Sequence, residues 1–265
     1  MNLQLKIRIM SPKILVICFI KLSIWKTLGN SSCPSNLTEV GPGICMLVIK
    51  HTGSYCKAHE LCETEGQARG LRLFVPGRNA HLITALVPPV SIVFTGISAF
   101  LNQSINYRDG WRYGDPGWSS HIISATDASI PWYSGEPNEF QASIALLYWQ
   151  TLCDDRQFAR NSTHVVCEMS NYQLNGSMEP FKQNMPYSIS IPFFAHNHSV
   201  GCFILTNETT IIQCALRCKL RIVCRSFYFN TAVGLCALSL YVDSLLPQNM
   251  STIPGTWTRF GRPNG

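Results

Sequence analysis

Residues 132–138 read Trp-Tyr-Ser-Gly-Glu-Pro-Asn, and the interpretation of the chain starts from this stretch. Glu136 and Asn138 place a carboxylate and an amide carbonyl on one short loop, with Pro137 between them. Ca²⁺ is a hard cation that takes about six to eight oxygen ligands, and these two side chains supply suitable ones. We therefore expect this loop to bind a metal ion of the calcium type.

The loop closes a long segment in which few strands are predicted. Residues 101–138 are rich in Gly, Trp, Asp and Ser. A stretch of this length without strands is unusual in a compact domain and is usually functional. Its tryptophans, Trp111, Trp118 and Trp132, are candidates to stack on a sugar ring; the alternative is that they pack in the core.

One predicted helix and four predicted strands surround this segment. Residues 54–66 start at a capping-type Ser54, place apolar residues at helical spacing and stop at Gly66. The most apolar stretch, residues 83–100, is interrupted by Pro88-Pro89 and predicts a buried strand region, not a membrane span. The predicted strands are residues 71–75, 91–97, 143–149 and 163–168.

A second, smaller group of elements follows from residue 199. Residues 209–220 predict a helix that carries Cys214 and Cys218 four positions apart, hence on one face. Residues 224–229 and 235–240 predict two strands joined by a turn. A helix held to a hairpin by two disulfides is the economical interpretation.

The N-terminus and the cysteine content predict a secreted, extracellular protein. Residues 1–29 combine basic positions, a short apolar run and small residues, as a signal peptide does; the alternatives are a signal anchor or a wrong start codon. Of the 12 cysteines only Cys18 lies there, and the others show no zinc-type spacing. Sequons for N-glycosylation occur at Asn30, Asn36, Asn102, Asn161, Asn175, Asn197, Asn207 and Asn249.

The charge distribution argues against nucleic acid as a partner. The formal charge is +6, but five basic residues lie before residue 30, where there is no acid, so the rest of the chain is nearly neutral. No nucleophile elbow, zinc-protease helix or phosphate loop occurs in the sequence. We therefore expect a protein that is not an enzyme.

The first group of motifs resembles the long form of the C-type lectin-like domain, over roughly residues 33–168. The resemblance implies disulfides Cys33–Cys45 and Cys62–Cys167. The segments that carry it, in chain order, are Cys33-Pro34 with Cys45, Tyr55-x-x-Ala58-x-x-x-Cys62, Phe94-Thr-Gly-Ile97, Trp132 to Asn138, and Val165-Val-Cys167-Glu168.

The resemblance also implies how the loop works. In the family the proline of the Glu-Pro-Asn motif is cis, which turns both neighbours toward a Ca²⁺ ion. Its implied ligands here are Glu136, Asn138, Glu139, Asp154 and Asp155. The ion takes two vicinal sugar hydroxyls, and this motif is typical of sites for mannose, fucose and N-acetylglucosamine. The implied sugar contacts are Glu136, Asn138, Asp154 and Asp155.

Two departures from the family pattern concern this site. The family's Trp-Asn-Asp motif reads Cys153-Asp154-Asp155 here, and an ionised Asp154 cannot donate a hydrogen bond to a sugar hydroxyl. The disulfide that braces the loop in the family is missing. In its place stand two unusual cysteines, Cys56 and Cys153, which we expect to pair with each other.

The second group resembles the PAN/apple module over about residues 199–260. The resemblance implies disulfides Cys214–Cys236 and Cys218–Cys224. It leaves Cys202 over, which predicts a reactive thiol or a disulfide-linked dimer; the alternative is that Cys202 pairs with Cys56 or Cys153.

The expected fold class is therefore α+β. We expect a signal peptide (1–29), a C-type lectin-like domain with mixed antiparallel sheets, two helices and a long loop region (30–170), a linker with the first strand of the second domain (171–198), and a small PAN/apple-like domain (199–262). The predicted function is Ca²⁺-dependent binding of glycans or glycoproteins, with protein ligands for the PAN-like domain. The alternative is a Ca²⁺-independent, protein-binding adhesion or recognition protein.

Overall fold

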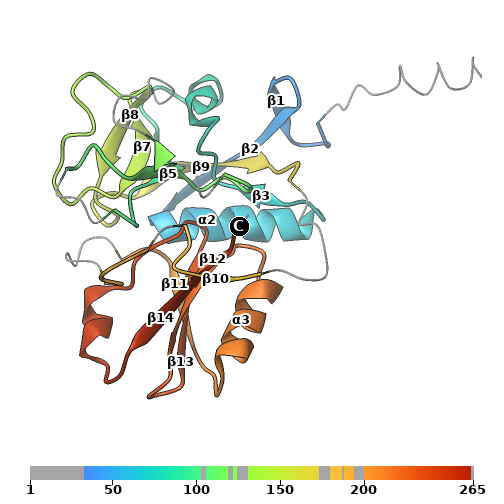
Figure 1. Cartoon of the computed structure of the whole chain (residues 1–265). Helices are drawn as coiled ribbons and strands as arrows, with labels where there is room; N and C mark the ends of the chain where they lie inside the picture. Colours follow the sequence, from blue (N-terminus) through green and yellow to red (C-terminus); the bar gives the residue numbers. More distant parts are fainter. Residues whose placement is uncertain are drawn as a thin grey trace, which may run out of the picture.

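The computed structural model describes residues 33–102, 106–118, 122–123, 131–172, 180–186, 188–193 and 200–263. Within these ranges the chain forms three antiparallel sheets and two α-helices (Figure 1). None of the described helices is long and apolar enough to cross a bilayer. The predicted signal peptide and the sequons at Asn30, Asn175 and Asn197 lie outside the described residues.

The first sheet has the strand order β1-β2-β9-β3 and packs against helix α2. Its disulfide Cys62–Cys167 joins the helix to β9, and Cys33–Cys45 holds the N-terminal segment to β2. These are the two pairs that the resemblance implies. The elements are β1 (Thr38–Gly41), β2 (Ile44–Gly53), α2 (Tyr55–Ala68), β3 (Leu73–Phe74) and β9 (Ser162–Met169).

The second sheet has the order β6-β5-β4-β7-β8. Its buried side chains form one core cluster with Met46 of β2 and Val166 of β9 in the first sheet. Its central strand β4 is buried at nearly every position, because Phe94 packs edge-on against Tyr55 of helix α2 while Val93 and Ile97 belong to the core of this sheet. The elements are β4 (Ile92–Ser98), β5 (Trp111–Tyr113), β6 (Ile122–Ile123), β7 (Ile144–Tyr148) and β8 (Thr151–Asp155).

The expected second helix of the first domain is a 3₁₀ helix, η1 (Ala80–Ala85), and not an α-helix. Strand β4 begins only at Ile92, so the stretch from Ile83 to Pro89 is not the buried strand region that its apolar content predicts. The Thr84 hydroxyl donates to the His81 carbonyl, and Pro88-Pro89 follows, so the segment cannot continue as regular structure.

The third sheet, of order β10-β14-β12-β13-β11, carries helix α3 on one face. Thr210 and Gln213 form a capping box that starts α3, and disulfides Cys214–Cys236 and Cys218–Cys224 pin it, again the pairs implied by the resemblance. The elements are β10 (Lys182–Gln183), β11 (Phe203–Asn207), α3 (Ile211–Leu220), β12 (Cys224–Asn230), β13 (Leu235–Leu240), η2 (Gln248–Thr252) and β14 (Trp257–Gly261).

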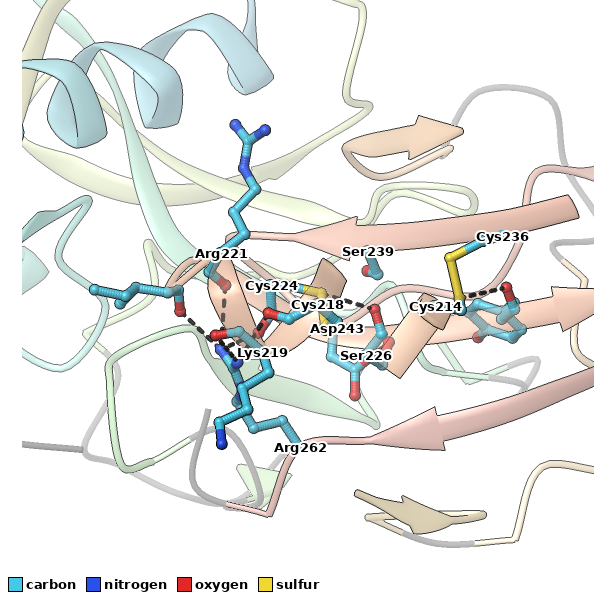
Figure 2. Close-up of a disulfide and its surroundings, with 12 residues drawn as sticks. Cys214, Cys218, Lys219, Arg221, Cys224, Ser226, Cys236, Ser239, Asp243 and Arg262 are labelled. Carbon is cyan, nitrogen blue, oxygen red and sulfur yellow. Dashed lines mark hydrogen bonds between the residues drawn. A yellow bond between two sulfur atoms is a disulfide. The ribbon is translucent and has the colours of Figure 1, made fainter. Parts of the chain in front are cut away.

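A buried arginine closes the C-terminal end of α3. Arg262 is 3% exposed, and Figure 2 shows its guanidinium directed at carbonyls in and just after the last helical turn. Its Nη2 donates to Cys218 O at 2.9 Å and Lys219 O at 3.1 Å, and its Nη1 donates to Cys224 O at 2.8 Å. The last carbonyls of a helix have no partner within the helix, so this side chain satisfies groups that burial would leave unpaired.

We call the first two sheets with α2 the first unit and the third sheet with α3 the second unit. In Figure 1, α2 lies between them, and one core cluster continues from α2 into the second unit. His59 stacks on Tyr241 of the second unit at 5.2 Å between ring centroids, and the Tyr241 hydroxyl donates to Glu63 at 2.8 Å. The helix is therefore buried on two faces.

The predicted pair Cys56–Cys153 is wrong. Cys56, at the N-terminal end of α2, is bonded to Cys202, with 5.6 Å between the Cα atoms. The proposed dimer through Cys202 is therefore corrected as well, and Cys153 is the unpaired cysteine of the described residues. The Cys56 sulfur faces the second unit beside Gly201, whereas the Cys153 thiol lies on β8 beside Thr151. The two sulfur atoms therefore have different neighbours and do not meet.

Candidate functional site

The candidate site is the loop before β7, where the Glu136–Pro137 peptide bond is cis. The base of the loop is fastened to β8: Trp132 forms a parallel bridge with Leu152, and Tyr133 N donates to Leu152 O at 2.8 Å. A turn follows, in which Glu136 N donates to Tyr133 O at 2.9 Å. The motif stretch is thus an ordered turn held against a strand.

Asp154 organises the tip of this loop. Its carboxylate accepts the backbone N–H of Asn138 at 3.1 Å and of Glu139 at 2.9 Å, and the residue is only 8% exposed. A carboxylate offers acceptors only, with about four lone-pair sites, so the two backbone donors leave acceptor capacity for a cation. An aspartate at this position therefore has a structural reason, although it cannot also donate to a ligand.

The carboxylates of Glu136 and Asp154 lie close enough to interact. Burial, as the largest cause, and the neighbouring Asp154 carboxylate together raise the pKa of Glu136 to about 7. The Asn138 side chain, which bonds to Glu136, opposes the rise in that pKa. Glu136 Oε2 is buried without a hydrogen-bond partner among the described residues. Glu136, Asn138 and Asp154 thus form a cluster that a cation would stabilise.

The other two expected ligands are engaged by arginines. Arg156 Nη2 lies 2.6 Å from Glu139 Oε1, and Arg160 Nε lies 2.8 Å from Asp155 Oδ2. No group of three or more His, Cys, Asp or Glu side chains within the described ranges has metal-binding geometry. The five implied ligands are therefore not gathered into one set. The sequence did not predict these two ion pairs, because they form only when the turn after β8 places Arg156 beside Glu139 and Arg160 beside Asp155.

Two exposed aromatic side chains stand at the ends of the loop. Tyr133 is 56% exposed and Phe140 is 54% exposed. Sequence reasoning considered tryptophans instead, and of these Trp111 is buried and packs edge-on against Trp132. Trp118 carries the Arg78 guanidinium 3.6 Å above its ring. The missed signal was the pair of aromatic residues Tyr133 and Phe140, which lie three positions before Glu136 and two positions after Asn138.

Cys153 lies on β8, next to Asp154 in sequence. Its thiol is 3.9 Å from the Thr151 hydroxyl, and burial, as the largest cause, raises the thiol pKa. A thiol with a raised pKa is mostly protonated at neutral pH and reacts slowly. The odd cysteine thus lies beside the candidate site and not in the second unit.

Comparison with known proteins finds solved structures that are similar to about half of the chain. No protein-family model matches it. No curated protein matches it either. Among solved structures it is similar to the C-type lectin CEL-I from Cucumaria echinata, with TM-score 0.40 and 11% identity over 54% of this chain and 100% of the other.

Two further solved structures show a similar extent of likeness. The carbohydrate-recognition domain of the mouse scavenger receptor C-type lectin gives TM-score 0.36 and 15% identity, over 52% of this chain and 97% of that chain. Human lithostathine gives TM-score 0.37 and 15% identity, over 54% of this chain and 94% of that chain.

Proposed function

We propose that this chain is a secreted carbohydrate-binding protein whose first unit is a C-type lectin-like domain with its ligand site at residues 133–140. The observation that carries the proposal is the Glu136–Glu139 loop, which Asp154 holds through two backbone N–H groups and in which an oxygen of Glu136 has no hydrogen-bond partner among the described residues. Five disulfides in the described residues favour an extracellular location.

Glu136, Asn138 and Asp154 fit a Ca²⁺ ion, since they supply oxygen ligands and Glu136 Oε2 has no hydrogen-bond partner within the described part of the chain. When bound, the ion would take vicinal sugar hydroxyls into its coordination shell. Three side chains leave several coordination positions to water and sugar, so we expect a dissociation constant of about 10⁻⁴–10⁻³ M, as in other extracellular modules.

The side chains of the loop would divide the recognition of the sugar. The Glu136 carboxylate accepts a hydrogen bond from a hydroxyl, and the Asn138 amide donates one. Asp154 stays on the backbone N–H groups and shapes the loop. Tyr133 and Phe140 offer exposed ring faces to the apolar face of a sugar. This arrangement suits sugars with a mannose-type pair of hydroxyls.

The test is retention of the purified chain on mannose, fucose and galactose resins, with and without Ca²⁺. We expect retention on mannose or fucose that a chelator abolishes and that Glu136→Gln removes. The matched control is Glu39→Gln, which changes an acid on β1 that contributes nothing to the loop. Wild-type protein that passes through every resin in Ca²⁺ would refute the proposal.

A second candidate is Ca²⁺-independent binding of a protein partner. It is favoured by Arg156 and Arg160, which occupy Glu139 and Asp155 and so reduce the ligand set. Calorimetric titration with Ca²⁺ separates the two candidates. The second predicts no heat in wild-type protein and no difference in Glu136→Ala.

The second unit fits a role as an accessory adhesion module of the PAN/apple type. Its helix and hairpin are joined by Cys214–Cys236 and Cys218–Cys224. This assignment rests on the motif order in the sequence and on these bridges. Binding of glycoproteins by the isolated first unit and by the whole chain would measure its contribution.

A further inference from the structure

The turn between β8 and β9 connects the candidate site to the second unit. It begins directly after Asp155, and its first five residues include Arg156 and Arg160, the partners of Glu139 and Asp155. Between these arginines lies Gln157, which is 1% exposed. A fully buried glutamine between two surface arginines needs partners in the protein interior.

Gln157 finds those partners in Val200 and Gly201, at the start of the second unit, and in Cys56 of α2. Its Oε1 accepts the N–H groups of Val200 and Gly201, each at 2.9 Å. Its Nε2 donates to Gly201 O at 2.9 Å and to Cys56 Sγ at 3.3 Å. An amide side chain has two donors and two acceptor lone pairs, and all four are used. The next residue of the second unit is Cys202, bonded to Cys56.

We call residues 133–140 the ligand loop. We infer that Gln157 is a positioning residue through which the second unit holds the ligand loop in shape. We call its contacts with Val200, Gly201 and the Cys56–Cys202 disulfide the clamp. β8 ends two residues before Gln157, so the clamp fixes the end of the strand that carries Asp154. Asp154 in turn fixes the N–H groups of Asn138 and Glu139.

Hydrogen exchange of the full chain tests this inference without any ligand. Gln157→Ala should speed exchange at the Asn138 and Glu139 amides by about tenfold, because the end of β8 loses buried hydrogen bonds. Gln157→Glu keeps an acceptor for Val200 and Gly201 but replaces the donor to Gly201 O with a second acceptor, so it should not restore slow exchange. The matched control is Tyr241→Phe, which removes the hydroxyl bond to Glu63 elsewhere in the same junction.

Equal exchange at these two amides in wild type and Gln157→Ala would overturn the inference, and so would an equal increase in Tyr241→Phe. A second measurement rests on the proposed function: the Ca²⁺ dissociation constant should rise several-fold in Gln157→Ala and stay unchanged in Tyr241→Phe. If wild type binds neither Ca²⁺ nor sugar, the proposed function fails, while the exchange result still decides the role of Gln157.

A separate observation concerns β11, which lies at the edge of the third sheet and pairs only with β13 in the described part of the chain. Leu240 N donates to Cys202 O at 2.8 Å, which sets the register of bonded pairs. The backbone groups of Phe203, Leu205 and Asn207 therefore face outward, away from β13. Leu205 is 49% exposed, and its side chain shares a face of the strand with Asn207.

An exposed edge with an apolar side chain is a site for unwanted strand pairing. Asn207 is exposed and begins the sequon Asn207-Glu208-Thr209 at the end of this edge. We propose that Asn207 carries an N-linked glycan that covers the free edge of β11 and the side chain of Leu205. The proposal shares with the proposed function only the passage through the secretory pathway.

Mass spectrometry of the secreted chain after enzymatic deglycosylation tests the modification. We expect Asn207 to be predominantly occupied and Asn207→Gln to self-associate several-fold more, measured by sedimentation velocity. The control, Thr38→Ala, removes the sequon of the exposed Asn36 on the other unit. Unmodified Asn207 in secreted protein would overturn the proposal, and so would a variant as monomeric as the control.

Discussion

The ligand loop and the junction between the two units are held by opposite means. The loop relies on a few polar bonds around Asp154 and on ion pairs whose arginines are nearly half exposed. The junction has a disulfide, a continuous apolar core and buried polar side chains such as His59 and Arg225. This difference indicates that contacts in the junction contribute more to the free energy of unfolding than contacts in the loop do, whereas the loop keeps polar groups available to a ligand.

The largest expected effect lies in the second unit, at Arg262. Arg262→Lys loses the fork of donors that reaches carbonyls in and after the last turn of α3, and losing two such charge-assisted bonds should lower the free energy of unfolding by about 3–5 kcal/mol. Arg217→Lys is the control, with a change below about 1 kcal/mol, because the Arg217 side chain on the same helix is 63% exposed and Lys can keep the charge beside Glu208. Chemical denaturation checks both, and equal losses would contradict the comparison.

The next effect concerns the disulfide across the junction. The double variant Cys56→Ala with Cys202→Ala should lose about 2–4 kcal/mol, because the bridge restricts the unfolded chain over a long loop. Thermal unfolding in two separate steps would show that the bridge makes the units one cooperative body. A single transition at the wild-type temperature would show that the core alone is sufficient.

Acid should weaken the junction through His59. Burial, with a contribution from Arg225, lowers the pKa of His59 to about 3. Between this value and the ordinary pKa of about 6.5, the unfolded chain binds a proton that the folded chain excludes, so stability is lost as pH falls below about 6.5. The loss should reach about 1.4 kcal/mol per pH unit.

His59→Phe removes this contribution to the pH dependence while keeping a ring against Tyr241. Unfolding measured at several pH values between 7 and 5 should therefore fall less steeply in the variant than in wild type. Other groups, such as Asp115, whose buried carboxyl has a pKa raised to about 6, contribute equally to both proteins. Parallel pH profiles would contradict the assignment.

The smallest expected effect is in the loop itself. Asp154→Asn restores a donor for sugar but leaves one acceptor oxygen for two backbone N–H groups, so it should cost about 1 kcal/mol of stability. We expect tighter sugar binding per bound Ca²⁺ in this variant, measured by calorimetry. Unchanged sugar affinity would place the sugar contact away from Asp154.

Local patterns predicted much of both regions. Helical spacing and stop signals located α2 and α3 within a few residues, and β-branched runs located β4, β7, β9, β12 and β13. The ten-residue strand β2 and strand β8 were not predicted, although β8 carries Asp154 and Asp155. Its short, mixed sequence becomes a strand only because β7 provides the pairing edge.

The amino-acid sequence by itself determined the two groups of elements and the Glu136–Asn138 loop, and its resemblance to two families implied four of the cysteine pairs. Tertiary structure decided that Cys56 pairs with Cys202, across 146 positions, because disulfide connectivity depends on which surfaces meet and not on spacing. It also decided that α2 buries a second face, and that arginines hold Glu139 and Asp155. Such contacts join segments far apart in the chain, and no local pattern encodes them.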